Sequence, residues 1–397
     1  MALKTLIELF DERPLENVLS AEMFRPERIV YICPENIYND RQKHLKLVEY
    51  FKHRGIELEL VFLKAKVYEM ETILELLRET VKKYPDCALD VSGGTDDALF
   101  AAGRLSAEVD IPVFTYSRKL NRYFEISGAP FAGELSCEVQ YNVEDFFLMA
   151  GGSMRMGRVD NSVLNKYMED IEPFFELYLK FRRKWQGIVN YIQRVSKNKV
   201  EGYVELEVSG DYTVKGDRGR KIDAPEDALR AYEQIGFISE LHIDRVSGVS
   251  FRFKDAQVRS WMRDIGSVLE LYVYKACLDT GIFNDVRTSA VVYWEGYDVR
   301  QENAVSNELD VMCAKGVTPV FISCKTSAVQ TEALNELAIL RDRFGSNTAK
   351  AAIVTAERGG GAMRNRAEEL GITVIDINDL SRGRTKQRIK SLLNTKN

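Results

Sequence analysis

The sequence predicts an α/β protein built in three parts, and three observations support that prediction. Strand and helix patterns alternate through residues 1–150, helices and a strand pair fill residues 151–255, and a second α/β pattern runs through residues 256–397. A chain of 397 residues is long enough for two to three domains at about 150 residues each. Hydrophobic residues make up 45% of the chain and charged residues 29%, so there is enough apolar material for buried cores.

The first part alternates short apolar runs with segments of helical spacing. Strands are predicted at 28–33, 57–63, 88–91 and 111–116, and helices at 40–54, 69–83 and through 98–105. Repeated strand–helix–strand units joined by short loops are typical of a mostly parallel sheet with helices on both faces. We therefore expect residues 1–150 to form a Rossmann-like domain.

The middle part has a different character. A loop with glycines, methionines and two arginines is predicted at 151–158, followed by helices over 163–195 and 225–235 and extended stretches at 204–208, 212–214, 238–243 and 249–253. Helices followed by a two-stranded wing resemble a winged-helix unit. Because no basic recognition helix stands out, a helical linker with a packing hairpin is the alternative interpretation.

The third part returns to alternating strands and helices. A long helix is predicted at 256–280, and a meander of strands at 286–294, 308–314 and 319–323. A helix at 331–344, a strand at 351–355, a helix at 362–370, a strand at 373–375 and a basic tail complete the pattern.

Charge and composition exclude several classes of function. With 55 Lys and Arg against 60 Asp and Glu, the net charge is −5, so the chain is no polycation and any contact with nucleic acid must be local. Only three histidines, His44, His53 and His242, are scattered along the chain, which argues against a poly-His metal site and a Ser/His/Asp triad. Six cysteines without a C-x-x-C pair predict buried, reduced thiols. No apolar segment is long enough to span a membrane, so we expect a soluble, cytoplasmic protein.

Two acids and a lysine on neighbouring predicted strands form the most specific chemical signal. Glu308 and Asp310 lie two residues apart on one strand, so their side chains point to one face of the sheet, and Lys325 follows the next apolar run. Carboxylate oxygens suit Mg²⁺ or Mn²⁺, and a lysine can position water or stabilise charge on a phosphate. The pattern predicts metal-dependent cleavage of a phosphodiester bond, and a surface hairpin with ordinary charges is the alternative.

A third carboxylate, Glu270, lies among apolar neighbours on the predicted helix 256–280, where it is costly unless it is paired or bound to metal. The order of helix Glu, strand Asp, strand Lys and following helix resembles the PD-(D/E)xK nuclease superfamily. On that resemblance Asp310 matches the acid of the first half-motif and Lys325 the lysine of the second. Ser323 stands where the family usually has Glu or Asp, so Glu308 and Glu270 are the candidates to replace that metal ligand.

A second signal is the turn of Ser92, Gly93, Gly94 and Thr95 after the predicted strand 88–91. Glycines let the backbone approach a ligand, and the following helix offers free N–H groups, so the turn suits a phosphate or a ribose. The turn is neither a Walker loop nor the dinucleotide fingerprint, because G-K-[ST] and G-x-G-x-x-G are absent. A tight structural turn is the alternative interpretation.

Together, the two signals resemble the CARF-domain nucleases of type III CRISPR antiviral defence. On that resemblance the Rossmann-like part, residues 1–150, is a CARF sensor, residues 151–255 are a connector, and residues 256–397 are a PD-(D/E)xK nuclease domain. The resemblance implies a homodimer that binds a cyclic oligoadenylate, commonly cyclic tetra-adenylate, and then cleaves DNA or RNA, single-stranded or double-stranded, with Mg²⁺ or Mn²⁺. It implies that Glu308, Asp310 and Glu270 hold the metal and that Lys325 orients water. The ligand-facing positions that it implies are Pro34, Glu35, Asn36 and Ser92, Gly93, Gly94 and Thr95.

Two further segments carry several basic residues. The tail from Arg382 to Lys390 suits a phosphate backbone or an amphipathic helix, and Gly359–Gly361 with its flanking arginines suits a substrate path or a flexible turn. Two rival functions are also compatible with the sequence. One is a ligand-responsive, winged-helix transcription regulator with a degenerate nuclease fold, and the other is a restriction- or repair-type nuclease with a structural first domain.

Overall fold

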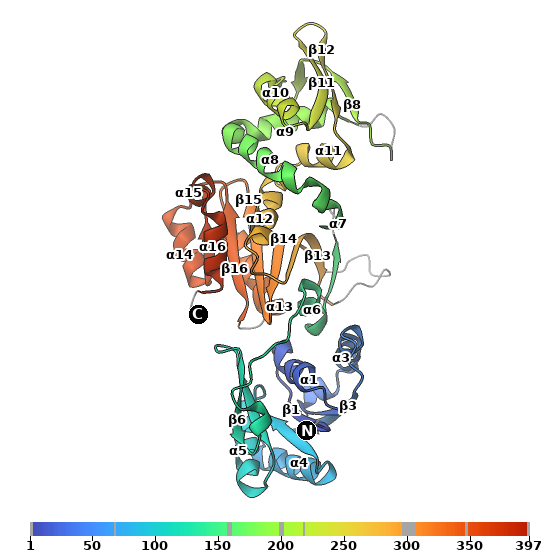
Figure 1. The fold of residues 1–397 in the computed structure, drawn as a ribbon, viewed down its shortest axis with the longest axis vertical. Coiled ribbons are helices and arrows are strands. Elements are labelled where there is room, and N and C mark those ends of the chain that lie inside the picture. Colours follow the sequence, from blue (N-terminus) through green and yellow to red (C-terminus); the bar gives the residue numbers. More distant parts are fainter. Residues whose placement is uncertain are drawn as a thin grey trace.

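The computed structural model of the chain describes residues 3–66, 69–156, 161–197, 202–216, 219–295, 306–345 and 348–394. Two six-stranded sheets, a three-stranded sheet and a two-stranded hairpin form the β structure of these residues. The molecule is elongated, with the N-terminal sheet at one end and the middle segment at the other (Figure 1). The C-terminal sheet therefore lies between two parts that precede it in the sequence.

The N-terminal sheet has the strand order β3-β2-β1-β4-β5-β6, parallel except for the edge strand β6. Its strands are β1 (Thr5–Leu9), β2 (Arg28–Pro34), β3 (Glu59–Ala65), β4 (Cys87–Asp90), β5 (Val113–Ser117) and β6 (Arg122–Ser127). Helices cover both faces, as predicted: α1 (Leu19–Phe24), α2 (Glu35–Tyr38), α3 (Arg41–His53), α4 (Met70–Lys83) and α5 (Asp96–Glu108), with short 3-10 turns η1 (Pro14–Asn17) and η2 (Pro130–Ala132). The predicted Rossmann-like arrangement is thus present.

Strands β1 and β6 are absent from the strands that the sequence predicts. β1 lies at the centre of the sheet and all five of its residues are buried. Thr5 and Glu8 interrupt its apolar run, so its pattern does not resemble that of a strand covered on both faces. β6 is largely exposed and pairs antiparallel with β5.

The C-terminal sheet has the order β17-β16-β15-β14-β13-β7. Strands β13 (Asp285–Tyr293), β14 (Ser306–Lys315) and β15 (Thr318–Lys325) form the predicted antiparallel meander, and β16 (Lys350–Thr355) and β17 (Ile372–Ile375) continue it in parallel. The prediction of a loop at 151–158 is wrong where the structure describes it, because β7 (Ser153–Met156) pairs with β13. This segment becomes a strand because it pairs with β13, which is more than 100 residues away in the sequence. The local sequence pattern does not encode such a pairing. Residues 157 and 158 lie outside the described residues.

The predicted helix 256–280 is two helices, α11 (Ala256–Met262) and α12 (Ser267–Asp279). Asp264 causes the break, since its Oδ1 accepts the N–H groups of Gly266 and Ser267 at 2.9 and 2.8 Å and starts a new helix. The remaining helices of this part are α13 (Thr331–Gly345), α14 (Gly361–Glu369), α15 (Ile377–Ser381) and α16 (Thr385–Leu392). In the basic tail, α16 buries Ile389 and Leu392, which favours the amphipathic-helix interpretation.

The middle segment packs helices against a small sheet of order β11-β12-β8. Its strands are β8 (Glu207–Gly210), β11 (Ile238–Asp244) and β12 (Gly248–Phe253), and a hairpin joins β9 (Thr213–Lys215) to β10 (Lys221–Asp223). Its helices are α7 (Asn161–Leu164), α8 (Met168–Phe181), α9 (Trp185–Val195) and α10 (Glu226–Gln234), with 3-10 turns η3 (Asn165–Tyr167) and η4 (Arg182–Lys184). The predicted wing strands thus belong to a three-stranded sheet.

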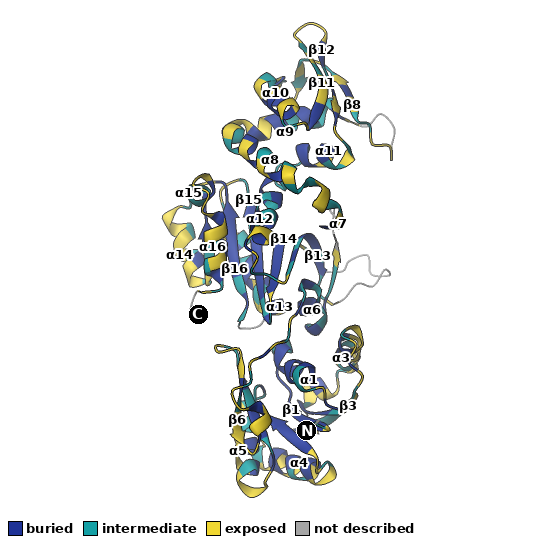
Figure 2. Cartoon of the chain, in the orientation of Figure 1, coloured by how far each residue is buried: buried dark blue, intermediate teal, exposed yellow. Residues whose placement is uncertain are grey.

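Hydrophobic cores connect all three parts. One core runs from the N-terminal sheet through α6 (Val143–Met149) into the C-terminal sheet, and Phe147 of α6 packs edge-on against Phe344 of α13 with ring centroids 5.0 Å apart. A second core joins α8, α9 and α10 to α12 and the opposite face of the C-terminal sheet. Figure 2 shows this burial concentrated on the strands of the C-terminal sheet. The C-terminal sheet therefore shares a core with each of its neighbours.

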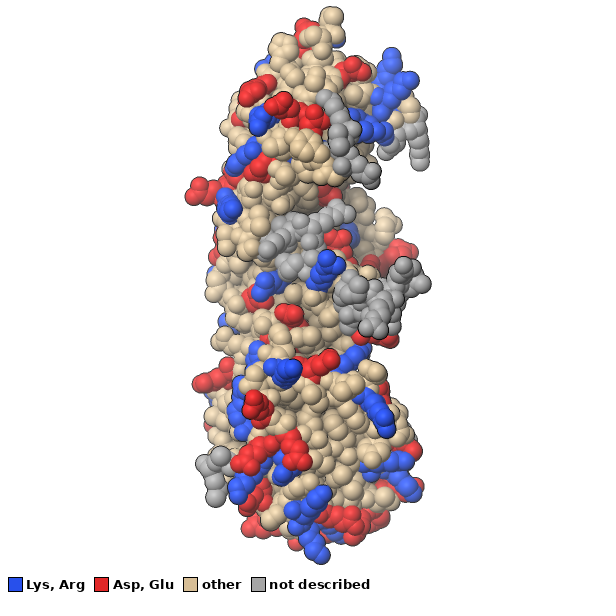
Figure 3. Space-filling view, turned by 90° about the vertical axis from the view of Figure 1, so that its right-hand side faces the viewer, with Lys and Arg blue, Asp and Glu red and all other residues tan. Residues whose placement is uncertain are grey.

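The surface and the cysteines agree with the composition. Figure 3 shows Lys and Arg interspersed with Asp and Glu on the face that it presents, without one dominant sign. All six cysteines are buried with free thiols, as predicted. Across the helices that the structure describes, none combines the length and apolar character needed to cross a membrane.

Candidate functional site

Asp310 and Lys325 meet at the end of the β14–β15 pair. The two strands are antiparallel, with Val311 opposite Ile322, which brings Asp310 beside the last residues of β15. Its Oδ2 accepts the Cys324 N–H at 2.6 Å and the Ser323 hydroxyl at 3.1 Å, and the Lys325 Nζ lies 3.7 Å from the same oxygen. The Asp310 side chain is 15% exposed and that of Lys325 39%, so solvent and a substrate can still reach this pair.

Ser323 has a clear part in this geometry. It stands where the nuclease pattern usually has an acid, and here its hydroxyl donates to Asp310. The Asp310 backbone is also fixed, because the Thr288 hydroxyl donates to its carbonyl at 2.7 Å. These contacts orient the Asp310 carboxylate. Because Ser323 is not an acid, an additional metal ligand must come from another residue.

Glu270 approaches the same place from α12. Burial raises the pKa of Glu270 to about 8, and the negative charges of Asp310, Asp264 and Glu308 contribute to that rise, while Lys325 opposes them. A Cβ added at Gly266 would lie 2.8 Å from the Glu270 Oε1, so the absence of a side chain at Gly266 makes room for this carboxylate. Glu308 is exposed on β14, two residues before Asp310.

The structure thus brings all four predicted residues, Glu270, Glu308, Asp310 and Lys325, into one electrostatic neighbourhood. Among the described residues, no three Asp, Glu, His or Cys side chains already lie close enough together to hold a metal ion. The donor set nevertheless fits a hard divalent cation, because it offers oxygens only and a cluster of like charges that such an ion would relieve. Sequence reasoning missed Asp264 and Gly266, whose spacing before Ser267 is typical of a helix start.

The second candidate site lies at the C-terminal edge of the N-terminal sheet. The strand order reverses between β1 and β4, and a crevice at such a switch point is where open α/β sheets bind ligands. The turn of Ser92, Gly93, Gly94 and Thr95 follows β4 there. Asn36 is exposed on α2 after β2, at the same edge of the sheet.

Internal hydrogen bonds hold this turn closely. Ser92 donates its N–H to the Asp90 Oδ1 at 2.7 Å, and its hydroxyl accepts the Tyr116 N–H at 2.7 Å. The Gly94 N–H donates to the Asp11 Oδ2 at 2.9 Å. A carboxylate therefore already occupies one position that a phosphate oxygen could take, and the Thr95 hydroxyl donates to Asp97 at the start of the following helix.

Residues that the sequence analysis did not single out complete this edge. Asp11 follows β1 and is paired with Arg13, while Arg118 follows β5 and is paired with Glu16. A Cβ at Gly93 would lie 2.9 Å from the Cβ atoms of both Asp11 and Glu16, so the turn packs against this cluster. Once β1 is recognised as a strand, its C-terminal end identifies Asp11 and Arg13 as candidates.

Comparison with known proteins identifies the C-terminal part. A family model described as Card1-like, endonuclease domain, matches residues 259–394. The chain contains an endonuclease domain. Glu270, Glu308, Asp310 and Lys325 all lie inside the matched range, whereas the turn after β4 and the middle segment up to residue 258 lie outside it.

Two solved structures share the fold over their full length. Protein VC1899 from Vibrio cholerae superposes with a TM-score of 0.74 at 16% identity, covering 98% of this chain and 98% of that one. Can2 from Sulfobacillus thermosulfidooxidans, solved in complex with cyclic tetra-adenylate, gives a TM-score of 0.70 at 15% identity, covering 99% of this chain and 98% of Can2. No curated protein matches the sequence significantly. The matched range, residues 259–394, includes strands β13 to β17 of the C-terminal sheet, while β7 lies outside it.

Proposed function

We propose that the chain is a metal-dependent nuclease of CRISPR antiviral defence, switched on by a cyclic oligoadenylate bound at the edge of the N-terminal sheet. The observation that supports the catalytic half is the contact of Lys325 with Asp310 beside Glu270, inside an endonuclease domain. The full-length likeness to Can2, solved with cyclic tetra-adenylate, favours that molecule as the activator. Six buried free thiols suit the reducing cytoplasm.

In this proposal Asp310, Glu270 and Glu308 hold Mg²⁺ or Mn²⁺. Such an ion supplies Lewis-acid stabilisation of charge on the phosphate. Asp310 is held in place by Cys324 and Ser323, so its carboxylate is oriented before substrate arrives. Lys325 places a positive charge beside it, where it orients the attacking water and stabilises the charge that develops on the phosphate. Water then replaces one ester oxygen of the phosphodiester, and that oxygen leaves with a proton.

We further propose that two copies associate through the N-terminal part. A ligand with rotational symmetry meets the same turn twice at a two-fold interface. Phe100 on α5, close after the turn, is 68% exposed, and Leu120 and Ile126 near β6 are 58% and 56% exposed. Association of two copies there would remove these apolar side chains from water.

The test of the catalytic assignment is cleavage by the full chain. Supercoiled plasmid DNA and labelled single-stranded RNA are incubated with Mn²⁺ or Mg²⁺, with and without cyclic tetra-adenylate. We expect cleavage only with both metal and activator, and a loss of at least about 100-fold in Asp310→Asn and Lys325→Ala. Both variants should still bind the activator.

Matched controls are Asp342→Asn on α13 and Lys315→Ala at the end of β14, which remove the same charges from exposed positions. They should cleave normally. Full activity in Asp310→Asn or Lys325→Ala overturns the site assignment. Cleavage without the activator would favour a constitutive nuclease, and specific duplex binding without any cleavage would favour a transcription regulator.

A further inference from the structure

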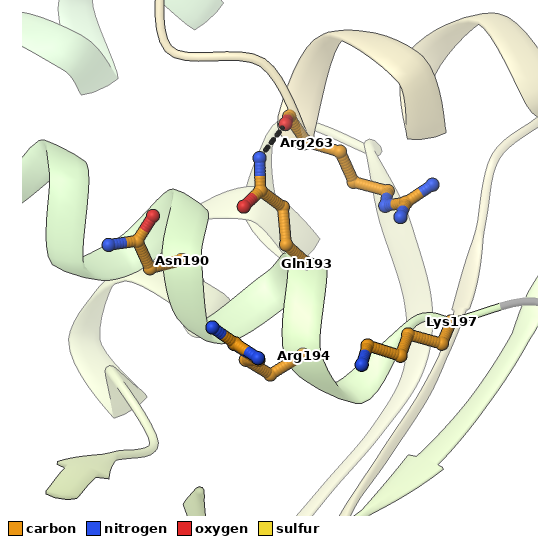
Figure 4. A pocket seen from close by; sticks show the side chains of 5 residues that line it. All are labelled: Asn190, Gln193, Arg194, Lys197 and Arg263. Carbon is orange, nitrogen blue, oxygen red and sulfur yellow. Dashed lines mark hydrogen bonds between the residues drawn. The ribbon is translucent and has the colours of Figure 1, made fainter. Parts of the chain in front are cut away.

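A basic pocket lies in the middle segment, outside both sites described above. Its volume is about 240 Å³, and its lining comes from two places in the chain: Asn190, Gln193, Arg194 and Lys197 on and after α9, and Arg263 after α11. Figure 4 shows the side chains of Arg194, Lys197 and Arg263 arranged around Gln193. Within the part of the chain that the structure describes, the lining includes three cations, two amides and no acid.

A hydrogen bond from α9 holds the backbone of Arg263 in place. The Gln193 amide donates to the Arg263 carbonyl at 2.6 Å, and the Trp185 indole donates to the Ile265 carbonyl at 3.3 Å. The Arg263 Nε is buried and, among the described residues, has no hydrogen-bond partner. Burial lowers the pKa of Arg263, as expected for a cation that has lost water without gaining an anion.

Cations at a helix C-terminus are common, because they complement the helix dipole, and this accounts for Arg194 and Lys197 at the end of α9. It does not account for Arg263, which reaches the pocket from another element. The buried Arg263 Nε has no hydrogen-bond partner among the described residues, and an anion bound in the pocket would supply one. The pocket is therefore built for an anionic group that carries several hydrogen-bond acceptors.

The pocket adjoins the catalytic helix. Arg263 is followed at once by Asp264, whose Oδ1 accepts the N–H of Ser267 at the start of α12, and Glu270 lies in the first turn of that helix. Four residues of chain span at most about 14 Å, and three helical residues add about 5 Å, so the Cα atoms of Arg263 and Glu270 lie within about 20 Å. That distance is less than one turn of a DNA duplex, about 34 Å.

We propose that this pocket, the α9 pocket, binds a backbone phosphate of the nucleic acid that the endonuclease domain cleaves. The inference rests on the proposed function, since it takes the phosphodiester substrate from there. It also explains how a chain of net charge −5 can hold a polyanion, because a local cluster of cations supplies the attraction. Backbone contacts position a substrate without reading its sequence, so the pocket sets the register of the strand on Glu270, Asp310 and Lys325.

The test measures binding, so that it does not depend on cleavage. The full chain carrying Asp310→Asn is titrated with a labelled duplex and a labelled single strand of several sequences, with cyclic tetra-adenylate and Mn²⁺, over a range of salt. We expect Arg194→Gln with Lys197→Gln, and separately Arg263→Gln, to weaken binding about tenfold for every sequence. The slope of log Kd against log salt should fall by about one for each phosphate that the variant no longer neutralises.

The matched control is Arg183→Gln with Lys184→Gln, which removes two cations at the other end of α9. It should leave affinity and salt slope unchanged, and thermal melting should show that all variants are folded. Unchanged affinity in the pocket variants, with cleavage still dependent on Lys325, would overturn the α9 pocket and leave the endonuclease intact.

Two further outcomes separate the sources of phosphate. If inorganic phosphate binds the parent chain and the pocket variants abolish that binding but not nucleic-acid binding, the pocket takes a free anion and our proposal is wrong. If the Asp310→Asn chain binds no nucleic acid under any of these conditions, the proposed substrate itself is wrong. Inorganic phosphate that competes with nucleic acid in the parent chain, but not in pocket variants whose nucleic-acid affinity has also fallen, supports the proposal.

Discussion

Gly94 holds the turn after β4 in a conformation that few other residues adopt. Its φ is +105°, and a Cβ there would lie 2.5 Å from the Leu9 Cβ. Its N–H bonds to Asp11, which pairs with Arg13. A ligand that reaches the turn therefore meets the Asp11–Arg13 pair. If a phosphate oxygen replaced Asp11 as the acceptor of the Gly94 N–H, the conformation of the turn and of the chain after β1 would both change.

Asp90 lies directly beneath this turn and is 3% exposed. Burial raises the pKa of Asp90 to about 6, against hydrogen bonds from Ser20 and Ser92 that lower it. Because the pKa in the folded state exceeds the usual value of 3.8, the folded state binds the proton more tightly than the unfolded state. The associated stability is complete below about pH 4 and is lost as the pH rises through about 6.

We predict that Asp90→Asn removes this pH dependence. In the parent chain, Asp90 alone should lower the free energy of unfolding by on the order of 3 kcal/mol between about pH 4 and about pH 7. Urea unfolding across that range measures it. Glu8, whose pKa burial and Asp90 also raise, gives a slope of the same sign in both proteins, so to first order their difference isolates Asp90. Asp110→Asn, at an exposed position, is the control, and an identical slope in Asp90→Asn would refute the prediction.

At the scale of elements, helices and strands with their own periodicity were predictable, and elements defined by distant pairing were not. The meander of β13, β14 and β15 was predicted because each strand contains a short apolar run, at 290–293, 311–314 and 320–322. β7 was not, because the residues between Ser153 and Met156 become a strand only on the edge of β13. β1 was not predicted because Glu8 interrupts its apolar pattern, although this carboxylate is only 2% exposed in the middle of the sheet.

The same division applies to the candidate sites. Asp310 and Lys325 are on adjacent strands of one meander, so alternation and strand order sufficed to predict that they meet. Arg13 and Arg118 follow strands that are far apart in sequence, and their proximity to the turn depends on the sheet order. Arg263 depends on the packing of α9 against a segment some 70 residues later, an arrangement that no local pattern contains.

The junction of α3 and α6 joins the N-terminal sheet to the element that packs on the C-terminal sheet. Arg54, just after α3, bonds to Glu22 at 2.7 Å and to Asp145 of α6 at 3.0 Å. The side chains of Glu22 and Asp145 are 1% and 0% exposed, while that of Arg54 is 20% exposed. One guanidinium thus pairs with two buried carboxylates from different elements.

We predict that Arg54→Leu costs about 3–5 kcal/mol of stability, because it removes the guanidinium that pairs with two buried carboxylates. Arg78→Leu is the matched control, since it breaks exposed pairs with Glu75 and Glu108 and should cost at most about 1 kcal/mol. Urea unfolding of the full chain measures both. Equal losses in the two variants would show that the junction is no more than a surface contact.

At the scale of the whole molecule, the order of the parts in space differs from their order in sequence. The endonuclease domain lies between the N-terminal sheet and the middle segment, and shares a hydrophobic core with each (Figure 1). Packed cores transmit displacement because they are not continuously deformable. A change at the N-terminal sheet can therefore reach the C-terminal sheet through α6, without passing through the middle segment.

Such a change needs two arrangements of the molecule that the ligand binds unequally, and the proposed dimer of the N-terminal parts would provide them. We predict that Phe100→Asp, which places a charge on the exposed apolar side chain beside the turn, weakens dimerisation by at least about tenfold. Sedimentation equilibrium with and without cyclic tetra-adenylate measures the association, and cleavage assays follow activation. Val246→Asp, at a position 97% exposed in the middle segment, is the control and should leave both unchanged.

Because a symmetric ligand needs both turns, the Phe100→Asp chain should also lose activation at protein concentrations where the parent is dimeric, and regain it at higher concentration. Full activation of a chain that remains monomeric would show that one turn suffices and that the switch lies within a single copy.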